Sequence, residues 1–187
     1  MKIIGLDQSS TACGAAIFIN GKLSDYTLIK PKSSKRADEI WVSEEPHLIT
    51  ISMPEEEYGT TLLRITAIVD QLEILFESVK PDVVYFEEIF ENGNPKGFRS
   101  LSRLQGFIAH LCHKLGIRYV IVEESKWANS IATYGRGVKR AERKADINKR
   151  MNDLYGLDIK SDDITDALAI GTYAVSAEKE NEYGKDN

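Results

Sequence analysis

The sequence predicts one α/β domain built on a mixed sheet of five strands, in which an antiparallel unit is extended by parallel strands and flanked by helices. Three apolar segments with strand character open the chain, and two more lie between segments of helical periodicity. The resulting order, β-β-β-α-β-α-β-α-α-α, is typical of a sheet whose later strands join through helical crossovers. The chain has 187 residues, 42% of them hydrophobic, which is enough for one domain and its core.

The opening strands are predicted at residues 2–6, 12–19 and 22–29. Asn20 and Gly21 separate the second strand from the third, and both residue types tolerate the positive φ of a tight hairpin. We therefore expect these three strands to form the antiparallel unit.

Residues 30–58 interrupt this pattern, and we interpret them as an insertion or a long loop. Between residues 38 and 57 there is no Lys or Arg. Residues 47–53 alternate between polar and apolar side chains, which indicates an extra strand. The acids of the stretch are Asp38, Glu39, Glu44, Glu45, Glu55, Glu56 and Glu57.

The rest of the domain alternates helices and strands up to residue 177, and a flexible polar tail is expected at residues 178–187. The segments at 82–86 and 117–122 are apolar, so we expect strands that are buried on both faces. A turn is predicted at residues 134–137. The predicted helices are residues 60–79, 101–115, 126–133, 138–155 and 163–177.

Composition narrows the function classes. No apolar run approaches the roughly 18 residues of a membrane helix, and the N-terminus lacks the layout of a signal peptide. Cys13 and Cys112 suggest no disulfide framework or zinc motif, so both are expected to be core thiols in a reducing cytoplasm. The net charge is −5, but residues 126–150 hold eight bases and two acids, which predicts a basic face suited to a phosphate backbone.

Four carboxylates lie where predicted elements begin or end. Asp7 follows the first strand, and Glu87 ends the strand at 82–86. Asp163 and Asp166 are three residues apart on the first turn of the last helix, so they share a face. Because strand ends and helix starts gather the sites of α/β folds, we expect one cluster. Taken singly, Asp163 also fits a helix cap and Asp7 a turn.

A cluster of carboxylates is the ligand set that Mg²⁺ and Mn²⁺ prefer. Acids brought together would raise one another's pKa, and a divalent ion removes that cost. Two such ions can activate a water and stabilise the leaving oxygen of a phosphodiester. Whether Asp162 or Glu88 also contributes is left open by their position beside the cluster. The predicted metal ligands, for two ions in each site, are Asp7, Glu87, Asp163 and Asp166.

Four segments, IIGLDQSSTACGAAI, VVYFEEIFENGN, LSRLQGFIAHL and SDDITDALAIG, resemble in that order the RuvC family of Holliday junction resolvases, which have an RNase H-like fold. The likeness runs from residue 1 to about residue 175, and residues 30–58 fit it least. The family pattern has an acid after the first strand, a Glu ending the fourth strand and an acid-x-x-Asp-Ala-Leu-Ala helix. These catalytic positions fall on Asp7, Glu87, Asp163 and Asp166.

The resemblance implies a homodimeric, cytoplasmic endonuclease that requires Mg²⁺, with Mn²⁺ able to substitute. It would nick two symmetry-related strands of four-way and related branched DNA and leave 5′-phosphate and 3′-hydroxyl ends. The divergent sequence suggests a phage-encoded member, which would act in the cytosol of a bacterial host. Whether the helicase partners of bacterial members bind this chain is left open.

The resemblance also implies DNA-binding residues. In the family a Phe shortly after the catalytic Glu contacts bases at the junction centre, and Phe90 matches it, with a core position beside Ile89 as the alternative. Lys126 matches a base that stabilises the phosphate at the cleavage site. The remaining DNA-binding candidates are Lys139, Arg140, Arg143, Lys144, Arg99 and Arg103.

Three other functions stay open from the residues alone. Sugar kinases and actin-like ATPases begin with a similar hairpin, but they need a second such domain, which 187 residues do not provide. Another nuclease of the same fold, acting on forks, flaps or RNA–DNA hybrids, would use the same carboxylates. A non-cleaving junction-binding protein is the third, and it would have no need of all four acids.

Overall fold

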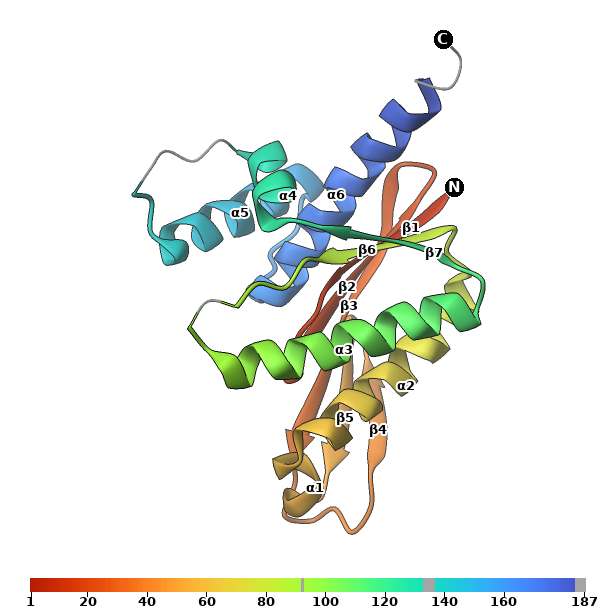
Figure 1. Ribbon diagram of the computed structural model, residues 1–187, viewed down its shortest axis with the longest axis vertical. Helices are drawn as coiled ribbons and strands as arrows, with labels where there is room; N and C mark the ends of the chain where they lie inside the picture. The colour runs from red at the N-terminus through yellow and green to blue at the C-terminus, as the bar shows by residue number, and fades with distance from the viewer. Residues whose placement is uncertain (92, 133–136, 184–187) are drawn as a thin grey trace.

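The computed structural model describes residues 1–91, 93–132 and 137–183, and it contains a seven-stranded mixed sheet with helices on both faces (Figure 1). The strand order across the sheet is β4-β5-β3-β2-β1-β6-β7. The strands are β1 (Lys2–Asp7), β2 (Cys13–Ile19), β3 (Lys22–Ser33), β4 (Trp41–Glu45), β5 (Leu48–Met53), β6 (Val83–Glu87) and β7 (Arg118–Val122). The helices are α1 (Glu55–Gly59), α2 (Thr61–Val79), α3 (Pro95–Lys114), α4 (Glu124–Ile131), α5 (Arg140–Tyr155) and α6 (Asp162–Tyr183).

The antiparallel unit expected at the N-terminus is present as β1, β2 and β3. Asn20 and Gly21 join the last two of these strands with φ values of +52° and +77°, the left-handed conformation that the hairpin signal requires. β6 pairs in parallel with β1, and β7 in parallel with β6. Since β1, β3, β6 and β7 all run in one direction, their C-terminal ends meet at the same edge of the sheet.

Residues 30–58 form an ordered extension of the sheet rather than a long loop. β3 continues to Ser33, four residues beyond its expected end at residue 29. β4 and β5 then form a hairpin, and β5 pairs in parallel with β3. β5 is the extra strand that the alternation at residues 47–53 indicates, because Ile51 and Met53 are buried in the core on one face of the sheet. This hairpin raises the number of strands from the expected five to seven.

α3 and α6 are longer than expected, for local reasons. α3 begins at Pro95 rather than at residue 101, because the Asn94 side chain caps the helix by accepting a hydrogen bond of 3.0 Å from the Gly97 backbone N–H. α6 continues beyond residue 177 to Tyr183, and Glu178 within this segment is buried. The turn expected at residues 134–137 lies outside the described residues except for its last position.

The expectation that the strand at 117–122 is buried on both faces was wrong. β7 is the last strand of the sheet, so one of its edges has no partner strand among the described residues. Tyr119 and Ile121 are exposed, and Val122 is buried. The run of apolar residues therefore reflects an edge strand with an open apolar face and not a central strand.

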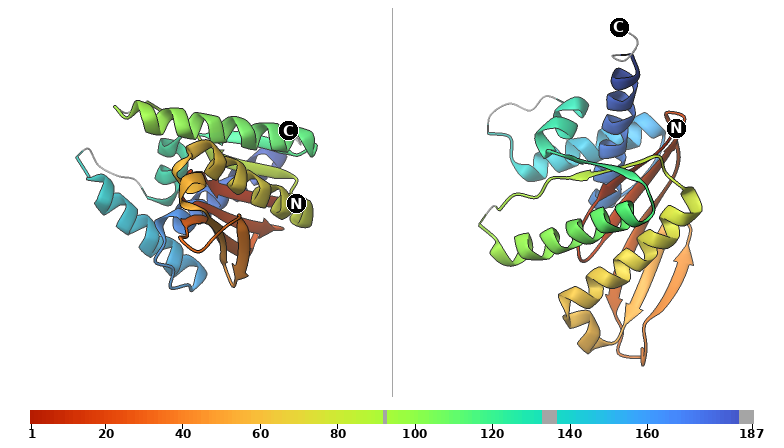
Figure 2. Two further views of the ribbon diagram at one scale, coloured as in Figure 1. Left: turned by 90° about the horizontal axis from the view of Figure 1, so that it is seen from below. Right: turned by 45° about the vertical axis from the view of Figure 1, so that its right-hand side comes forward.

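Two hydrophobic cores lie on opposite faces of the sheet. α2 and α3 cover one face, and α4, α5 and α6 cover the other (Figure 2). Cys13 and Cys112 are free, buried thiols in the first core, as expected. Among the helices that the structure describes, none combines the length and apolar character that crossing a membrane requires.

α6 packs directly on β1 and β2 because glycines face it. A Cβ atom added to Gly5 would lie 2.5 Å from the Ala167 carbonyl oxygen and 2.5 Å from the Gly171 nitrogen. One added to Gly14 would lie 2.0 Å from the Asp163 carbonyl oxygen. Backbone therefore meets backbone here, and this contact fixes the first turn of α6 beside the end of β1.

We expect Gly5→Ala to lower the free energy of unfolding by about 1–3 kcal/mol, because the added methyl group meets helix backbone that moves only with the whole helix. Denaturant titration followed by circular dichroism measures the change. The matched control is Gly106→Ala in α3, where nothing lies within 4 Å of the added Cβ and where Ala favours the helix. Equal stability of the two variants would contradict the close packing of α6 on β1.

Candidate active site

The four acids singled out from the sequence line a single cleft of about 270 Å³ at the C-terminal edge of β1 and β6. Asp7 is the last residue of β1 and Glu87 is the last residue of β6. Asp163 and Asp166 reach the cleft from the first turn of α6. The structure thus brings together residues that are up to 159 positions apart in the chain.

The end of β6 is held by two amide side chains. The backbone carbonyl of Glu87 accepts a hydrogen bond of 2.7 Å from Gln8 Nε2 and one of 3.0 Å from Gln105 Nε2. Gln8 directly follows Asp7, so the same amide ties the end of β1 to the end of β6. This bracing fixes the relative positions of the two strand-end carboxylates.

Burial makes the cleft unfavourable for negative charge. Burial, and then the charges of Asp166 and Asp163, raises the pKa of Asp7 well above its ordinary value. Burial, followed by the charges of Glu124 and Asp166, raises the pKa of Glu87 to about 7. The pKa values of Asp163 and Asp166 are also raised, chiefly by burial. The nearby bases Lys144 and Arg140 oppose this rise but do not cancel it.

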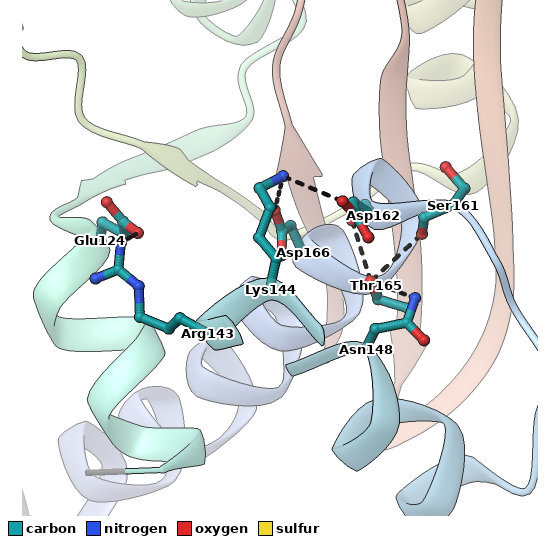
Figure 3. A network of polar contacts seen from close by, with 8 residues as sticks. All are labelled: Glu124, Arg143, Lys144, Asn148, Ser161, Asp162, Thr165 and Asp166. Atoms are coloured by element: carbon teal, nitrogen blue, oxygen red, sulfur yellow. Dashed lines mark hydrogen bonds and ion pairs between the residues drawn. The ribbon is translucent and has the colours of Figure 1, made fainter. Parts of the chain in front are cut away.

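Lys144 is the cation that lies closest to the acids of α6 (Figure 3). Its Nζ atom is 3.2 Å from Asp166 Oδ2 and 3.8 Å from Asp162 Oδ2. Its charge opposes the rise in pKa that burial causes at Asp163 and Asp166. One ammonium group facing this many carboxylates offsets only part of their mutual repulsion.

Lys126, which the sequence places at the cleavage site, is not among the side chains that line the cleft. It is exposed on α4, with its Nζ atom 3.8 Å from Glu123 Oε1. Lys144 of α5, expected only as part of the basic patch, lies in the cleft instead. The sequence could not rank the two, because the packing of α4 and α5 against α6 decides which lysine points inward.

The donors in the cleft fit a hard divalent cation. Its ligands would be carboxylate oxygens whose pKa values are raised by burial and by the charges of neighbouring acids. Gln8 Oε1 is a further oxygen at the cleft, and it is buried without a hydrogen-bond partner. Among the described residues, no three His, Cys, Asp or Glu side chains already stand in a closed ligand set. The acids line the cleft together and would have to draw closer around an ion.

A second hollow adjoins the cleft, and Phe90 lies on its wall. The Phe90 side chain is 61% exposed, so the alternative of a core position was wrong. Arg140 and Arg143 line both hollows, and Arg143 Nη2 lies 2.6 Å from Glu124 Oε1 (Figure 3). This part of the surface therefore presents an aromatic ring beside two guanidinium groups.

The other basic candidates lie outside these hollows. Lys139 is exposed at the N-terminus of α5, and Arg99 and Arg103 are exposed on α3. Glu88 lines the second hollow and its carboxylate accepts a hydrogen bond of 3.1 Å from the Ile89 backbone N–H.

The cleft residues that the sequence analysis did not predict include Gln8, Glu124 and Trp127. The sequence could have indicated Gln8, since its polar amide side chain directly follows Asp7. Trp127 looks like an ordinary core residue, yet its indole N–H is buried without a hydrogen-bond partner beside the cleft. Only the folded arrangement places Glu124 near Glu87.

Comparison with known proteins identifies related chains. A family model described as Lactococcus phage M3 protein matches residues 48–176. The crossover junction endodeoxyribonuclease RuvC of Campylobacter jejuni is 29% identical over 170 residues, which cover 91% of this chain and 92% of that protein. The protein of the same name from Campylobacter curvus is 26% identical over 170 residues, which cover 91% and 93%. The resemblance to the RuvC family that the motifs indicated is thereby confirmed.

Solved structures share the fold. The RuvC of Thermus thermophilus in complex with Holliday junction substrate has a TM-score of 0.66 at 16% identity, covering 96% of each chain. The Fowlpox virus resolvase in complex with substrate Holliday junction DNA has a TM-score of 0.51 at 14% identity, covering 95% of this chain and 99% of that one. These likenesses confirm the RNase H-like fold expected from the sequence.

We expect Glu87→Gln to stabilise the metal-free protein at pH 8 by on the order of 2 kcal/mol, because the native state no longer holds a desolvated carboxylate. Glu87 has a pKa of about 7 in the folded chain against 4.5 ordinarily, so the native state binds its proton more tightly. The wild type should therefore lose stability as pH rises from 4.5 through 7, whereas the variant should lose less.

Denaturant titrations in the presence of a chelator, at pH values from 4 to 8, measure the free energy of unfolding of both proteins. The control is Glu180→Gln, an exposed carboxylate on α6, which should follow the wild-type curve. Parallel curves for the wild type and Glu87→Gln would show that the cleft does not penalise the charge of Glu87.

Proposed function

We propose that the chain, which belongs to the Lactococcus phage M3 protein family, is a metal-dependent endonuclease that resolves Holliday junctions and related branched DNA by paired symmetric nicks. The observation that carries this proposal is the joint position of Asp7, Glu87, Asp163 and Asp166 in one cleft. Support comes from relatives named crossover junction endodeoxyribonuclease, which align with 91% of the chain. The description of the family supports a phage origin.

In this proposal the four acids hold two Mg²⁺ ions in each site, with Mn²⁺ able to substitute. The ions would supply a nucleophilic water and stabilise the charge on the leaving oxygen. The raised pKa values of Asp7 and Glu87 support a site that is completed by cations, because bound positive charge favours their ionised forms.

The chain's own bases would act on the phosphate. Lys144, beside Asp166, lies where it can neutralise the negative charge that builds on the scissile phosphate. Arg140 and Arg143 line the wall of the cleft and would bind the flanking phosphates. Phe90, exposed at the adjoining hollow, would stack on bases at the centre of the junction. Further phosphate contacts are assigned to Lys139, Arg99, Arg103 and Lys126.

A two-fold homodimer suits this chemistry, since each copy then meets an equivalent strand of a symmetric junction. The products would carry 5′-phosphate and 3′-hydroxyl ends, which a ligase can join without further processing.

The same cleft could serve a nuclease of broader or different substrate range. Carboxylate-held ions hydrolyse any phosphodiester, so the acids alone do not select a junction over a fork, a flap or an RNA–DNA hybrid. A non-cleaving junction-binding protein is the other alternative. The choice of substrate would come from the dimer and from the basic and aromatic surface around the cleft.

Asp163→Asn is expected to abolish cutting of a synthetic four-way junction in Mg²⁺ while leaving junction binding within about threefold, because a ligand is lost and the binding surface is kept. Strand-specific end labels report the nicks, and fluorescence anisotropy in Ca²⁺ reports binding. Asp158→Asn is the matched control, since Asp158 is exposed before α6.

Fork, flap, duplex and RNA–DNA hybrid substrates are tested beside the junction. Paired nicks on the junction alone would establish a resolvase, and equal cutting of forks and flaps a broader nuclease. Full activity of Asp163→Asn would overturn the assignment of the cleft.

Lys144→Ala is expected to lower kcat by about 10²-fold at saturating junction, because it removes the ammonium group beside the reacting phosphate. Lys126→Ala should mainly weaken binding, since its side chain is exposed outside the cleft. Single-turnover cleavage measures both. A larger loss of kcat in Lys126→Ala than in Lys144→Ala would return the phosphate-stabilising role to Lys126.

A further inference from the structure

The extension of the sheet has one face that the helices leave open. On β5, Ile51 and Met53 face the core under α1 and α2, so Thr50 and Ser52 face the opposite side. The core that α4, α5 and α6 form on this opposite side contains no residue of β4 or β5 among those the structure describes. No helix among the described residues covers this open face, although Ser52 is buried and Thr50 is half-buried within it.

The side chains of the open face are basic, hydroxylic and aromatic. Cross-strand pairing aligns Lys32 with Ser52 and Ser52 with Trp41 in one row. The neighbouring row aligns Lys30 with Thr50 and Thr50 with Ser43. We call these six residues the lysine–tryptophan face.

The charged and aromatic groups of this face are free to bind a ligand. Lys30 and Lys32 are exposed, and neither forms an ion pair with any residue that the structure describes. Trp41 is 50% exposed, although a Trp on a strand usually packs against a neighbour. Two unpaired cations beside an open indole ring match the needs of a polyanion that also offers flat rings.

The lysine–tryptophan face lies on the same side of the sheet as the candidate active site. Asp7 pairs with Gly14 across β1 and β2, and Gly14 pairs with Leu28 across β2 and β3. Leu28 is therefore two strands, or roughly 10 Å, from Asp7. Lys30 lies two residues further along β3, in the direction in which β1 enters the cleft. The first turn of α6, seated on Gly14, separates the two surfaces.

The acids of the insertion are largely segregated from this face. Glu44 faces the α1 side of the sheet, because it alternates with Ser43 on β4. Asp38 and the acids of α1 line a separate hollow with Pro54. Glu45 lies on the same side of the sheet as the lysine–tryptophan face, but at the hairpin turn, opposite Leu48. The net negative charge of residues 38–57 therefore does not indicate the electrostatic potential around Lys30 and Lys32.

We propose that the lysine–tryptophan face binds the DNA strand that leaves the active-site cleft, with phosphates at Lys30 and Lys32 and an unpaired base against Trp41. This inference rests on the proposed function, since it extends the substrate-binding surface of that same site. It gives residues 30–58, the part of the chain that least fits the RuvC pattern, a direct role in holding branched DNA.

The test measures binding of a four-way junction by Lys30→Ala/Lys32→Ala as a function of salt. Loss of two phosphate contacts should reduce the slope of log K against log salt by about 1.4–1.8. The matched control is Lys22→Ala/Lys179→Ala, two exposed lysines at the opposite end of the sheet, which carries the same change in net charge. For this control, the slope of log K against log salt should equal that of the wild type.

Trp41 is tested by substitution and by its emission. Trp41→Ala should weaken junction binding by on the order of 10-fold, and Trp41→Phe should retain most of the affinity because a phenyl ring also stacks. Junction binding should quench the tryptophan emission of the wild type, and Trp41→Phe should lose that quenching. Unchanged thermal melting of all variants, which alter exposed side chains, excludes unfolding as the cause.

Two outcomes separate the inference from the proposed function. If the wild type binds and cuts the junction while the lysine pair and Trp41 variants keep its slope, affinity and quenching, the lysine–tryptophan face is not a DNA surface and the nuclease assignment stands. If the wild type neither binds nor cuts any branched DNA, the proposed function fails, and this extension of it fails with it.

Discussion

Negative charge concentrated in a poorly hydrated cleft is the constraint around which this structure is organised. Carboxylates at the ends of β1 and β6 and on the first turn of α6 repel one another, and burial deprives them of water. The fold tolerates this because backbone packing, not side-chain contact, holds α6 against the sheet at Gly5 and Gly14. Lys144 compensates part of the charge. In the proposed function, bound cations would neutralise the remainder of this negative charge.

The sequence predicted the site residues whose positions follow directly from secondary structure. Asp7 and Glu87 directly follow apolar strands, so their positions at one edge follow from the parallel pairing of those strands. Asp163 and Asp166 share a helix face by spacing alone. The inward position of Lys144 and the outward position of Lys126 depend instead on how α4 and α5 pack, and no local pattern records that packing. The prediction that β7 is buried on both faces was wrong for a similar reason. Whether an apolar strand is central or at the edge depends on which strands pair with it.

The insertion shows how composition can conceal geometry. Residues 38–57 contain seven acids and no Lys or Arg, yet strand alternation divides the side chains of the insertion between two faces. One face carries Lys30, Lys32 and Trp41, and the acids of α1 lie toward the other. A charge total taken over a segment is therefore a poor guide once the segment forms strands.

The free edge of β4 bears on how the protein behaves at high concentration. Ile40, Trp41 and Val42 are exposed along an edge that has no partner strand among the described residues, and such an edge can recruit another chain. Glu44 and Glu45 lie at the end of this strand, so a parallel, in-register approach of two β4 edges would bring like charges together. The two glutamates of β4 therefore disfavour this mode of edge-to-edge association between copies of the chain.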